Sequence, residues 1–353
     1  MTHHQLAFFT RVLDEAPPAE RYRLAADQIR HAERFGIGRA WVAQHHFHEA
    51  EGGLPAPLVF LAHLAASTSE IRLATGVVTL TLEDPVRVAE DAIVADLLSG
   101  GRIDLGLGSG GTPSSFLPFG VDVADKAEVY ERKLGVLLAG LTGGEVGGKS
   151  RLYPAPGTLA DRIWQATFSV SGGTRAGIHG LGLMLSRTQP RPASHPTATL
   201  AEIQDPIIDA YLEALPTGAL PRVTASRTVF VADSREEARR YAEAGLRSAV
   251  VAMRRSGHTV ADDSLDELIR TLDTHVGTVY DVVESLAADP TLDRSQEIAF
   301  QVHSVDAPHE LILRSIELFA TEVAPALGWT SPDGAPAART SSSAGDPIGA
   351  TER

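Results

Sequence analysis

The stretch RAWVAQHHFH, residues 39–48, joins a buried strand to a cluster of polar side chains at its end. Its apolar part, Ala40–Ala43, has the composition of a strand that is covered on both faces, which is typical of parallel sheets. Three histidines follow at positions 45, 46 and 48. What this strand end can do depends on the sheet to which the strand belongs, because the sheet decides which residues it meets.

Strand and helix patterns alternate on both sides of this stretch. Apolar and β-branched segments predict eight strands, at residues 5–10, 40–43, 71–79, 103–108, 163–169, 181–186, 226–232 and 297–304. The segments between them are amphipathic, several with proline in the first turn, and predict helices. Eight alternating units over about 320 residues predict an α/β protein with a (β/α)8 TIM barrel.

Three segments fall outside this pattern. Residues 188–196 (TQPRPASHP) hold three prolines and predict a surface loop. Residues 253–275 predict a charged helical insertion between the seventh and eighth strands. The barrel domain is expected to span residues 1–328, and residues 329–353, rich in Pro, Gly, Ala, Ser and Thr, predict a disordered tail.

The composition favours a small-molecule partner. Lys and Arg number 31 against 45 Asp and Glu, which gives a net charge of −14 and argues against a nucleic acid or an anionic membrane as partner. The chain has no cysteine, and therefore no disulfide, thiolate nucleophile or cysteine-ligated zinc. Neither a signal-peptide pattern nor an apolar run of the ~20 residues that span a membrane is evident, so we expect a cytoplasmic protein.

Function collects at the carboxyl ends of the strands in a barrel of this kind. Residues 169–174 (SVSGGT) follow the fifth predicted strand and open a helix. We expect Ser171 to cap that helix, Gly172 and Gly173 to admit a ligand to the backbone, and Thr174 to add a hydroxyl, with Ser169 also among the binding residues. The turn predicts an anion site, with phosphate favoured over a plain capped turn.

Two glycine-containing segments predict a surface for a flat ring. Residues 106–111 (GLGSGG) lack the last glycine of the dinucleotide fingerprint, and they instead suit close approach of a ring or a ribityl-like chain. Thr75 and Gly76 lie inside the third predicted strand, where glycine indicates either a bulge or backbone that faces a ligand.

The three histidines allow several interpretations. His46 and His48 lie on alternate positions, as zinc ligands on a strand do, and Glu49 could join them. His303 is the one other histidine at a predicted strand end, and a polar loop of hydrogen-bonded histidines is the plain alternative. We favour acid–base work or orientation of a flavin, because imidazole exchanges protons near pH 7, and we predict no metal site.

Three segments resemble the bacterial luciferase-like flavin-dependent monooxygenases. Residues 41–47 resemble the family's W-x-x-E-H-H-F strand end, residues 85–110 its longest signature, and residues 300–327 its closing strand and helix. The resemblance implies a barrel that oxidises a small organic substrate with O2 and reduced FMN from a separate flavin reductase. It also implies a homodimer. Two alternatives remain, a deazaflavin-dependent hydride-transfer enzyme of the same fold and a non-catalytic flavin-binding protein.

The resemblance also assigns individual residues. It places His45 on the family's catalytic imidazole, with His46 in support, and the turn at 169–174 on the FMN phosphate site. It places a non-proline cis peptide at Ala74-Thr75. The cofactor is then lined by Thr75, Gly76, Gly108 and Ser109.

The chain departs from the family pattern at three positions. Gln44 replaces a glutamate, so a negative charge beside His45 is expected to be missing. Asp84 replaces a histidine before Pro85. Ser109 replaces an arginine, which leaves the phosphate to backbone amides, hydroxyls, and a cation such as Arg187 or Arg175.

Overall fold

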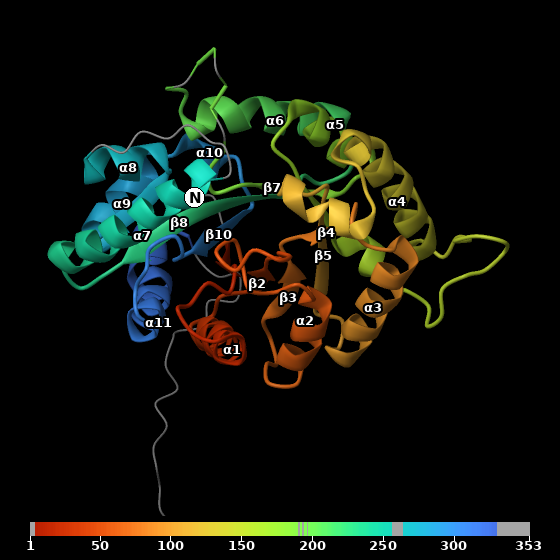
Figure 1. The fold of residues 1–353 in the computed structure, drawn as a ribbon, viewed down its shortest axis with the longest axis horizontal. Coiled ribbons are helices and arrows are strands. Elements are labelled where there is room, and N and C mark those ends of the chain that lie inside the picture. The colour runs from red at the N-terminus through yellow and green to blue at the C-terminus, as the bar shows by residue number, and fades with distance from the viewer. Residues whose placement is uncertain (1–3, 190, 193, 196, 256–263, 330–353) are drawn as a thin grey trace, which may run out of the picture.

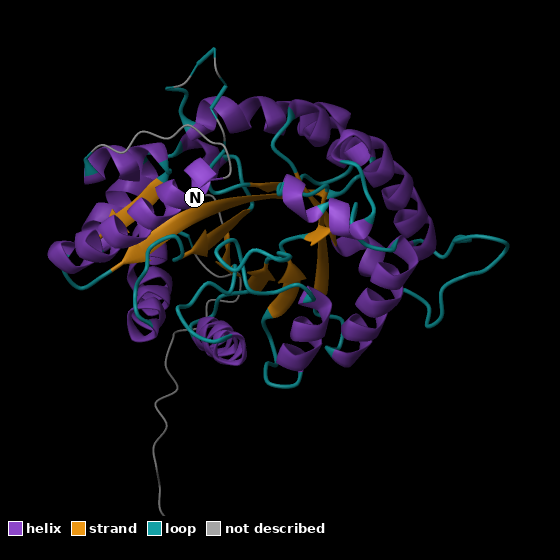
Figure 2. Cartoon of the chain, viewed as in Figure 1, coloured by secondary structure: helices purple, strands orange, loops and turns teal. Residues whose placement is uncertain are grey.

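The computed structural model describes residues 4–329, apart from 190, 193, 196 and 256–263, and its core is a closed ring of parallel strands surrounded by helices (Figures 1 and 2). Of the ten strands in this part of the chain, β4 pairs only with β5 and β9 only with β8, which leaves eight in the ring. The ring closes because β10 pairs with both β1 and β8. In ring order the strands are β1 (Gln5–Thr10), β2 (Arg39–Val42), β3 (Arg72–Thr75), β5 (Ile103–Gly108), β6 (Ile163–Ala166), β7 (Gly182–Leu185), β8 (Val223–Val231) and β10 (Glu297–Gln301). The predicted TIM barrel is confirmed.

The helices cover the outside of the ring, and their first turns follow familiar capping chemistry. Asp84, the departure before Pro85, accepts the Val86 and Arg87 amides at 2.9 and 3.0 Å and so caps α3. The main helices are α1 (Pro18–Arg34), α2 (Pro57–Ala65), α3 (Pro85–Leu98), α4 (Lys126–Leu141), α5 (Val170–Ile178), α6 (Leu200–Ala214), α7 (Arg235–Arg255), α8 (Leu265–Thr271), α9 (Val279–Ala287), α10 (Pro290–Asp293), α11 (His309–Leu318) and α12 (Ala324–Ala326). Short helical turns are η1 (Pro113–Ser115), η2 (Leu117–Phe119), η3 (Val123–Asp125), η4 (Leu159–Arg162) and η5 (Phe319–Val323).

The third barrel strand is divided, unlike the single strand that the sequence predicts. β3 pairs with β2 and β5, and after a break at Gly76 and Val77 the two-residue β4 (Val78–Thr79) pairs with β5 alone. The bond between Gly76 and Val77 is the cis peptide, so the position predicted for it, Ala74-Thr75, is wrong by two residues. A Cβ on Gly76 would lie 2.8 Å from the Phe9 ring, and glycine is therefore required where the strand breaks.

The segment between β8 and β10 contains a strand that the sequence pattern did not predict. The structure places α7, α8, β9 (Thr274–Gly277), α9 and α10 there, and β9 extends the sheet beyond β8 in parallel register. Part of the predicted helical insertion, residues 256–263, lies outside the described residues. The described remainder is the end of α7, all of α8 and the start of β9, so a purely helical insertion is wrong.

The barrel domain reaches at least to Trp329, the last described residue. Its indole is buried and packs edge-on against the His4 ring at 5.4 Å, with Phe319 also in contact. The predicted tail therefore starts no earlier than residue 330, beyond which the chain lies outside the described part. In that described part, no helix combines the length and apolar character needed to cross a bilayer.

The amino-terminal end of the barrel interior is filled by a neutralised charge cluster beneath two indoles. The Arg39 guanidinium lies 3.3 Å from the Asp104 carboxylate and also pairs with Glu297, while Trp41 Nε1 donates to Glu297 at 2.8 Å. Trp41 meets Trp164 edge-on, with ring centroids 5.6 Å apart. This packing closes the lower half of the barrel, so a ligand has access only from the carboxyl ends of the strands.

Candidate functional site

A cavity of about 2830 Å³ opens at the carboxyl ends of the barrel strands, where it touches the segments that follow nearly every strand of the ring. Single small-molecule sites typically measure about 300–1,000 Å³, so this volume suits a cofactor together with a substrate. The proline-rich loop contributes Gln189 and Arg191, and the segment before β9 contributes Met253 and Leu272. The predicted surface loop and the predicted insertion therefore both line the cavity in their described parts.

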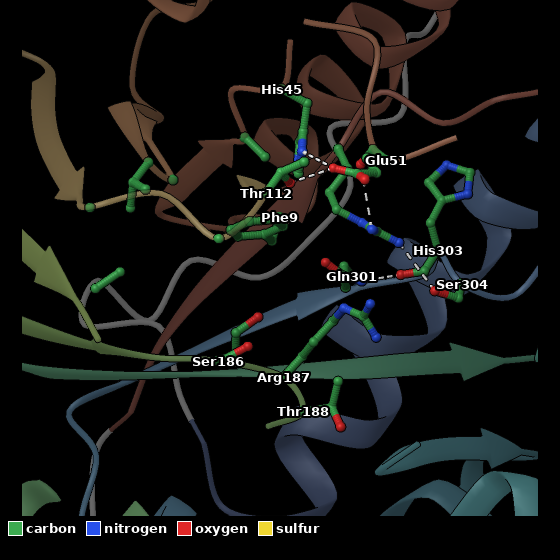
Figure 3. Close-up of a pocket in the computed structure, with 18 of the residues that line it drawn as sticks. Phe9, His45, Glu51, Thr112, Ser186, Arg187, Thr188, Gln301, His303 and Ser304 are labelled. Atoms are coloured by element: carbon green, nitrogen blue, oxygen red, sulfur yellow. Dashed lines mark hydrogen bonds and ion pairs between the residues drawn. The ribbon is translucent and has the colours of Figure 1, made fainter. Parts of the chain in front are cut away.

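His45 lies on the cavity wall after β2 with a carboxylate beside it. Its Nδ1 is 3.8 Å from Oε2 of Glu51, and the Thr112 hydroxyl donates to the same oxygen at 2.5 Å (Figure 3). The neighbouring His45 imidazole, followed by the hydrogen bond from Thr112, holds the pKa of Glu51 below its usual value. The expectation that no negative charge lies beside His45 is therefore wrong, because Glu51 provides one from the loop.

Glycine at position 52 allows this arrangement. A Cβ there would lie 2.5 Å from Cδ2 of the His45 ring and 3.0 Å from the Arg11 carbonyl oxygen. The loop can therefore fold back over the imidazole only with glycine next to Glu51.

Gln44 is a structural link that glutamate could not replace. Its amide nitrogen donates to Glu83 Oε1 at 2.6 Å and to the Pro55 carbonyl at 3.0 Å, and its amide oxygen accepts the Thr79 amide at 2.7 Å. A carboxylate has no N–H to donate, so the amide ties the end of β2 to β4 and to the following loop.

His46 and His48 do not converge on a common ligand position. Phe47 between them has φ 65°, so the chain turns there and the alternation expected of a strand is lost. The His46 ring packs against Phe119 with centroids 4.8 Å apart, and burial lowers its pKa. His48 Nε2 lies 2.7 Å from the Ser114 hydroxyl, and Glu49 pairs with Arg21 instead. Across the described residues, no group of three or more His, Asp or Glu side chains is placed to hold a metal ion.

The turn after β6 presents two hydroxyls to the cavity, but its cap is not the predicted one. Ser169 caps α5, because its hydroxyl accepts the Gly172 amide at 3.2 Å. The prediction that Ser171 caps this helix is therefore wrong. The Ser171 hydroxyl lies 3.2 Å from that of Ser169, and both residues line the cavity. Hydroxyls at the start of a helix are groups that can bind an anion, and the anion site at this turn stays a prediction.

Three other residues of this turn do not line the cavity. A Cβ on Gly173 would lie 2.5 Å from the Ile207 carbonyl oxygen, so this glycine permits close packing of α5 against α6. Gly172 is buried, with its carbonyl accepting Gln165 Nε2 at 2.8 Å, and the Thr174 hydroxyl donates within the helix to Val170 at 3.2 Å. The structure therefore contradicts the ligand contacts predicted for these three residues. For the glycines, the reason is that a glycine next to a ligand and a glycine in a tightly packed turn give the same sequence pattern.

Gly76, Gly108 and Ser109 border the cavity where β3 and β5 end. A Cβ on Gly108 would lie 2.6 Å from Cγ2 of Val77, so glycine is needed here for close packing against Val77. Thr75 was predicted to line the cofactor beside them, but it does not line the cavity. It is fully buried in the barrel wall, where its hydroxyl donates to the Gly106 carbonyl at 2.8 Å and accepts the Gly106 amide at 2.9 Å.

Two arginines reach into the cavity from opposite sides of the β8–β10 pair. Arg187, predicted as a phosphate ligand, follows β7 and donates to the Thr228 hydroxyl at 3.2 Å, and Figure 3 shows its side chain directed toward Gln301. Arg11, which the sequence reasoning missed, follows β1 and donates to the Ser304 hydroxyl at 3.1 Å. By contrast, Arg175, the other predicted phosphate cation, is paired with Glu131.

The model of the luciferase-like monooxygenase family matches residues 2–288. The chain belongs to this family. Its relatives include 4-hydroxyprotoasukamycin monooxygenase of Streptomyces nodosus subsp. asukaensis, 31% identical over 316 residues that cover 83% of each chain. We conclude that this luciferase-like protein is an enzyme, a monooxygenase-family oxidoreductase.

Solved structures share the fold of this luciferase-like enzyme at low identity. The oxygenating component of 3,6-diketocamphane monooxygenase from Pseudomonas putida, in complex with FMN, has a TM-score of 0.73 and 18% identity, with 92% of this chain and 98% of that one covered. The F420-dependent tetrahydromethanopterin reductase of Methanopyrus kandleri has a TM-score of 0.67 and 16% identity, covering 92% and 99%. These likenesses establish the shared fold.

Two cavity residues of this luciferase-like enzyme, Arg11 and Glu51, were not predicted, and they differ in how clearly the sequence marks them. Arg11 directly follows the first predicted strand, and a cation in that position of a barrel is a recognisable signal. Glu51 lies six positions after His45 in a loop, and only the folded path of the loop brings the two side chains together.

Proposed function

We propose that this enzyme binds FMN in the barrel cavity and uses its reduced form and O2 to oxidise a small organic substrate. The observation that carries the proposal is the convergence of an anion turn at Ser169 and Ser171, a glycine-lined wall at Gly76 and Gly108, and the His45–Glu51 pair in one cavity. An FMN complex of the same fold supports it.

The residues present fit such a cofactor. Gly76 and Gly108 border the cavity without side chains, and the first turn of α5 presents the Ser169 and Ser171 hydroxyls, which suit a phosphate. Phe9, Val77 and Met184 line the adjoining floor with apolar surface, which suits an aromatic ring system. When bound in its reduced form, FMN would supply the electrons that activate O2.

The chain's own part in the chemistry centres on His45. With Nδ1 facing Glu51, the Nε2 atom is the one free to exchange a proton with the cavity. Glu51, which lies beside Nδ1, fixes the orientation of the ring, as a carboxylate partner does for a general acid or base. The apolar floor around Phe9 limits water near the reacting atoms.

Titration with FMN and a coupled oxidation assay test this proposal. We expect oxidised FMN to bind with a dissociation constant in the micromolar range, and reduced FMN from a separate reductase to support transfer of one labelled oxygen atom from O2 to an organic substrate. Failure of FMN to bind below the millimolar range would contradict the proposal.

A deazaflavin enzyme is the second candidate, and the shared fold of the F420-dependent reductase is the observation that favours it. The same anion turn and glycine wall would serve both cofactors. Competition between FMN and F420 for the purified protein separates the two: displacement of FMN by F420 at equal concentration, with no oxygen transfer in the assay, would favour hydride transfer.

A further inference from the structure

Two guanidinium groups in the cavity lack a carboxylate partner. Among the described residues, no carboxylate oxygen lies within 4.0 Å of Arg11 or of Arg187. Arg11 donates to the Ser304 hydroxyl at 3.1 Å and to the Glu51 backbone carbonyl at 3.5 Å, and its Nε is buried without an acceptor in the described chain. Arg187 donates to the Thr228 hydroxyl at 3.2 Å. Neutral oxygens alone face these two positive charges.

The nearest acidic side chains are already engaged elsewhere. The Glu51 carboxylate faces His45 and Thr112, so only its backbone oxygen is left for Arg11. Asp273 is the acidic residue whose charge acts on Arg187, but its carboxylate pairs with Arg191 at 2.6 Å and accepts the Thr188 hydroxyl at 2.6 Å. The protein therefore supplies the two cations but leaves their counter-charge to another molecule.

Burial of the two arginines without a counter-charge lowers the pKa of each. Burial, with the neighbouring charge of Arg187, lowers the pKa of Arg11 to about 9, and burial lowers the pKa of Arg187 to about 10. Guanidinium nevertheless stays charged in proteins, so two like charges are held near each other with incomplete solvation. An anion bound between them would gain charge-assisted hydrogen bonds and remove the repulsion.

The arginines lie across the cavity from the glycine wall. In the eight-strand ring, β3, which Gly76 follows, and β5, which ends at Gly108, are opposite β8 and β10. Thr228, the acceptor for Arg187, belongs to β8, and Ser304, the acceptor for Arg11, follows β10. A molecule that touches both arginines is thus placed opposite a ring on the glycine wall, with the loop that carries His45 between the two at one side.

We propose that Arg11 and Arg187 bind the carboxylate of the substrate, so that the enzyme acts on an organic acid. This inference rests on the proposed function, because it assigns the cofactor ring to the opposite wall. A planar carboxylate matches the fork of guanidinium donors, whereas the α5 turn already offers a separate place for a phosphate. The pair therefore determines specificity by charge and orients the acid within the cavity.

Binding of a matched pair of probes, 2-naphthoate and 2-naphthamide, tests the proposal by calorimetry, with and without FMN. The probes share a shape and differ in charge. We expect the wild type to bind the carboxylate at least about tenfold more tightly, and Arg187→Gln or Arg11→Gln to abolish that preference, since losing a buried charge partner typically costs tenfold to several-hundredfold in affinity. Arg187→Lys, which keeps the charge, should retain part of the preference.

Arg270→Gln is the matched control. Arg270 also lines the cavity, but it is exposed and paired with Glu267, so its loss should leave the preference unchanged. Equal affinity for the two probes, or no binding of either in the millimolar range, would overturn the proposal.

FMN and riboflavin titrations distinguish the other source of negative charge, the cofactor phosphate. The proposal requires Arg187→Gln to keep the wild-type preference for FMN over riboflavin, and loss of that preference would assign the arginines to the cofactor and overturn it. If FMN does not bind but the enzyme still prefers 2-naphthoate to 2-naphthamide, only the proposed cofactor is contradicted.

Discussion

The two ends of the barrel interior treat arginine in opposite ways. At the amino-terminal end, Arg39 lies against the Asp104 and Glu297 carboxylates and is stacked on two indoles at 5.3 and 5.1 Å. At the carboxyl-terminal end, Arg11 and Arg187 meet hydroxyls and a carbonyl. The difference teaches that a buried charge neutralised within the chain serves the fold, while one left without a counter-charge serves a ligand. Barrels commonly divide stability and function between their two ends in this way.

His45→Ala should give the largest effect on activity and a small effect on the fold. General acid–base groups typically contribute about 10²–10⁴-fold in rate, so we expect a loss of that order in substrate oxidation while FMN binding persists. His48→Ala is the matched control from the same loop, because His48 bonds to Ser114 at the rim and should change the rate less than about twofold. Rates are measured as oxygen incorporation into the product by mass spectrometry. Equal losses in both variants would contradict the role of His45.

Glu297→Gln should give the reverse result, a large loss of stability with activity per folded molecule unchanged. Removing one carboxylate leaves Arg39 incompletely neutralised in the buried lower half, and breaking such a buried pair typically costs about 3–5 kcal/mol. Urea denaturation measures this cost. Glu317→Gln, from a half-exposed pair with Arg314, should change the stability by no more than about 0.5–1 kcal/mol. A loss below about 1 kcal/mol for Glu297→Gln would remove the distinction between the two ends.

Gly173→Ala separates a glycine that packs helices from one that faces a ligand. The added Cβ would approach the Ile207 carbonyl oxygen, which is fixed in α6, so we expect a loss of about 1–3 kcal/mol. Gly135→Ala in α4, where a Cβ meets open space, should instead stabilise by about 0.5–1 kcal/mol. Thermal unfolding measures both variants. A neutral Gly173→Ala with weakened FMN binding would restore the ligand role that the sequence suggested.

The smallest expected effect is a pH dependence that comes from Glu51. Its folded-state pKa is lowered by His45 and Thr112, so its contribution to stability is present above the unfolded-state pKa and is lost as the pH falls through the folded-state pKa. The stability difference between wild type and Glu51→Gln should therefore be largest above about pH 5 and shrink below about pH 4. A difference that stays constant over this range would show that the carboxylate charge is not what stabilises the His45 loop.

The elements of the barrel could be predicted closely because their signals are local. Strands at residues 5–10 and 103–108 agree with the structure at both ends, since apolar runs mark them in the sequence itself. The strand β9 could not be predicted, because its four residues lie between helices and carry no distinctive pattern. The break at Gly76 gave a signal, a glycine inside a strand, but not its exact consequence for the chain path.

The site was predicted in outline and missed where it depends on loops. His45, Gly76, Gly108, Ser169 and Arg187 line the cavity as expected, because strand ends of a barrel meet at one face. The partnership of His45 with Glu51 depends on a loop that folds back on itself, which residue types alone do not encode. Gly173 was assigned to a ligand because the residue that it packs against, Ile207 of α6, is distant in sequence, and Gly172 because its close contact with Thr167 exists only in the folded turn.

A crystal structure of the FMN complex would test the central claim, the separation of a cofactor side and a substrate side in one cavity, most directly. The account predicts the phosphate within hydrogen-bonding distance of the Ser169 and Ser171 hydroxyls at the start of α5, the ring against Gly76 and Gly108, and Arg11 and Arg187 free of the cofactor. A phosphate bound by Arg11 or Arg187 would contradict it.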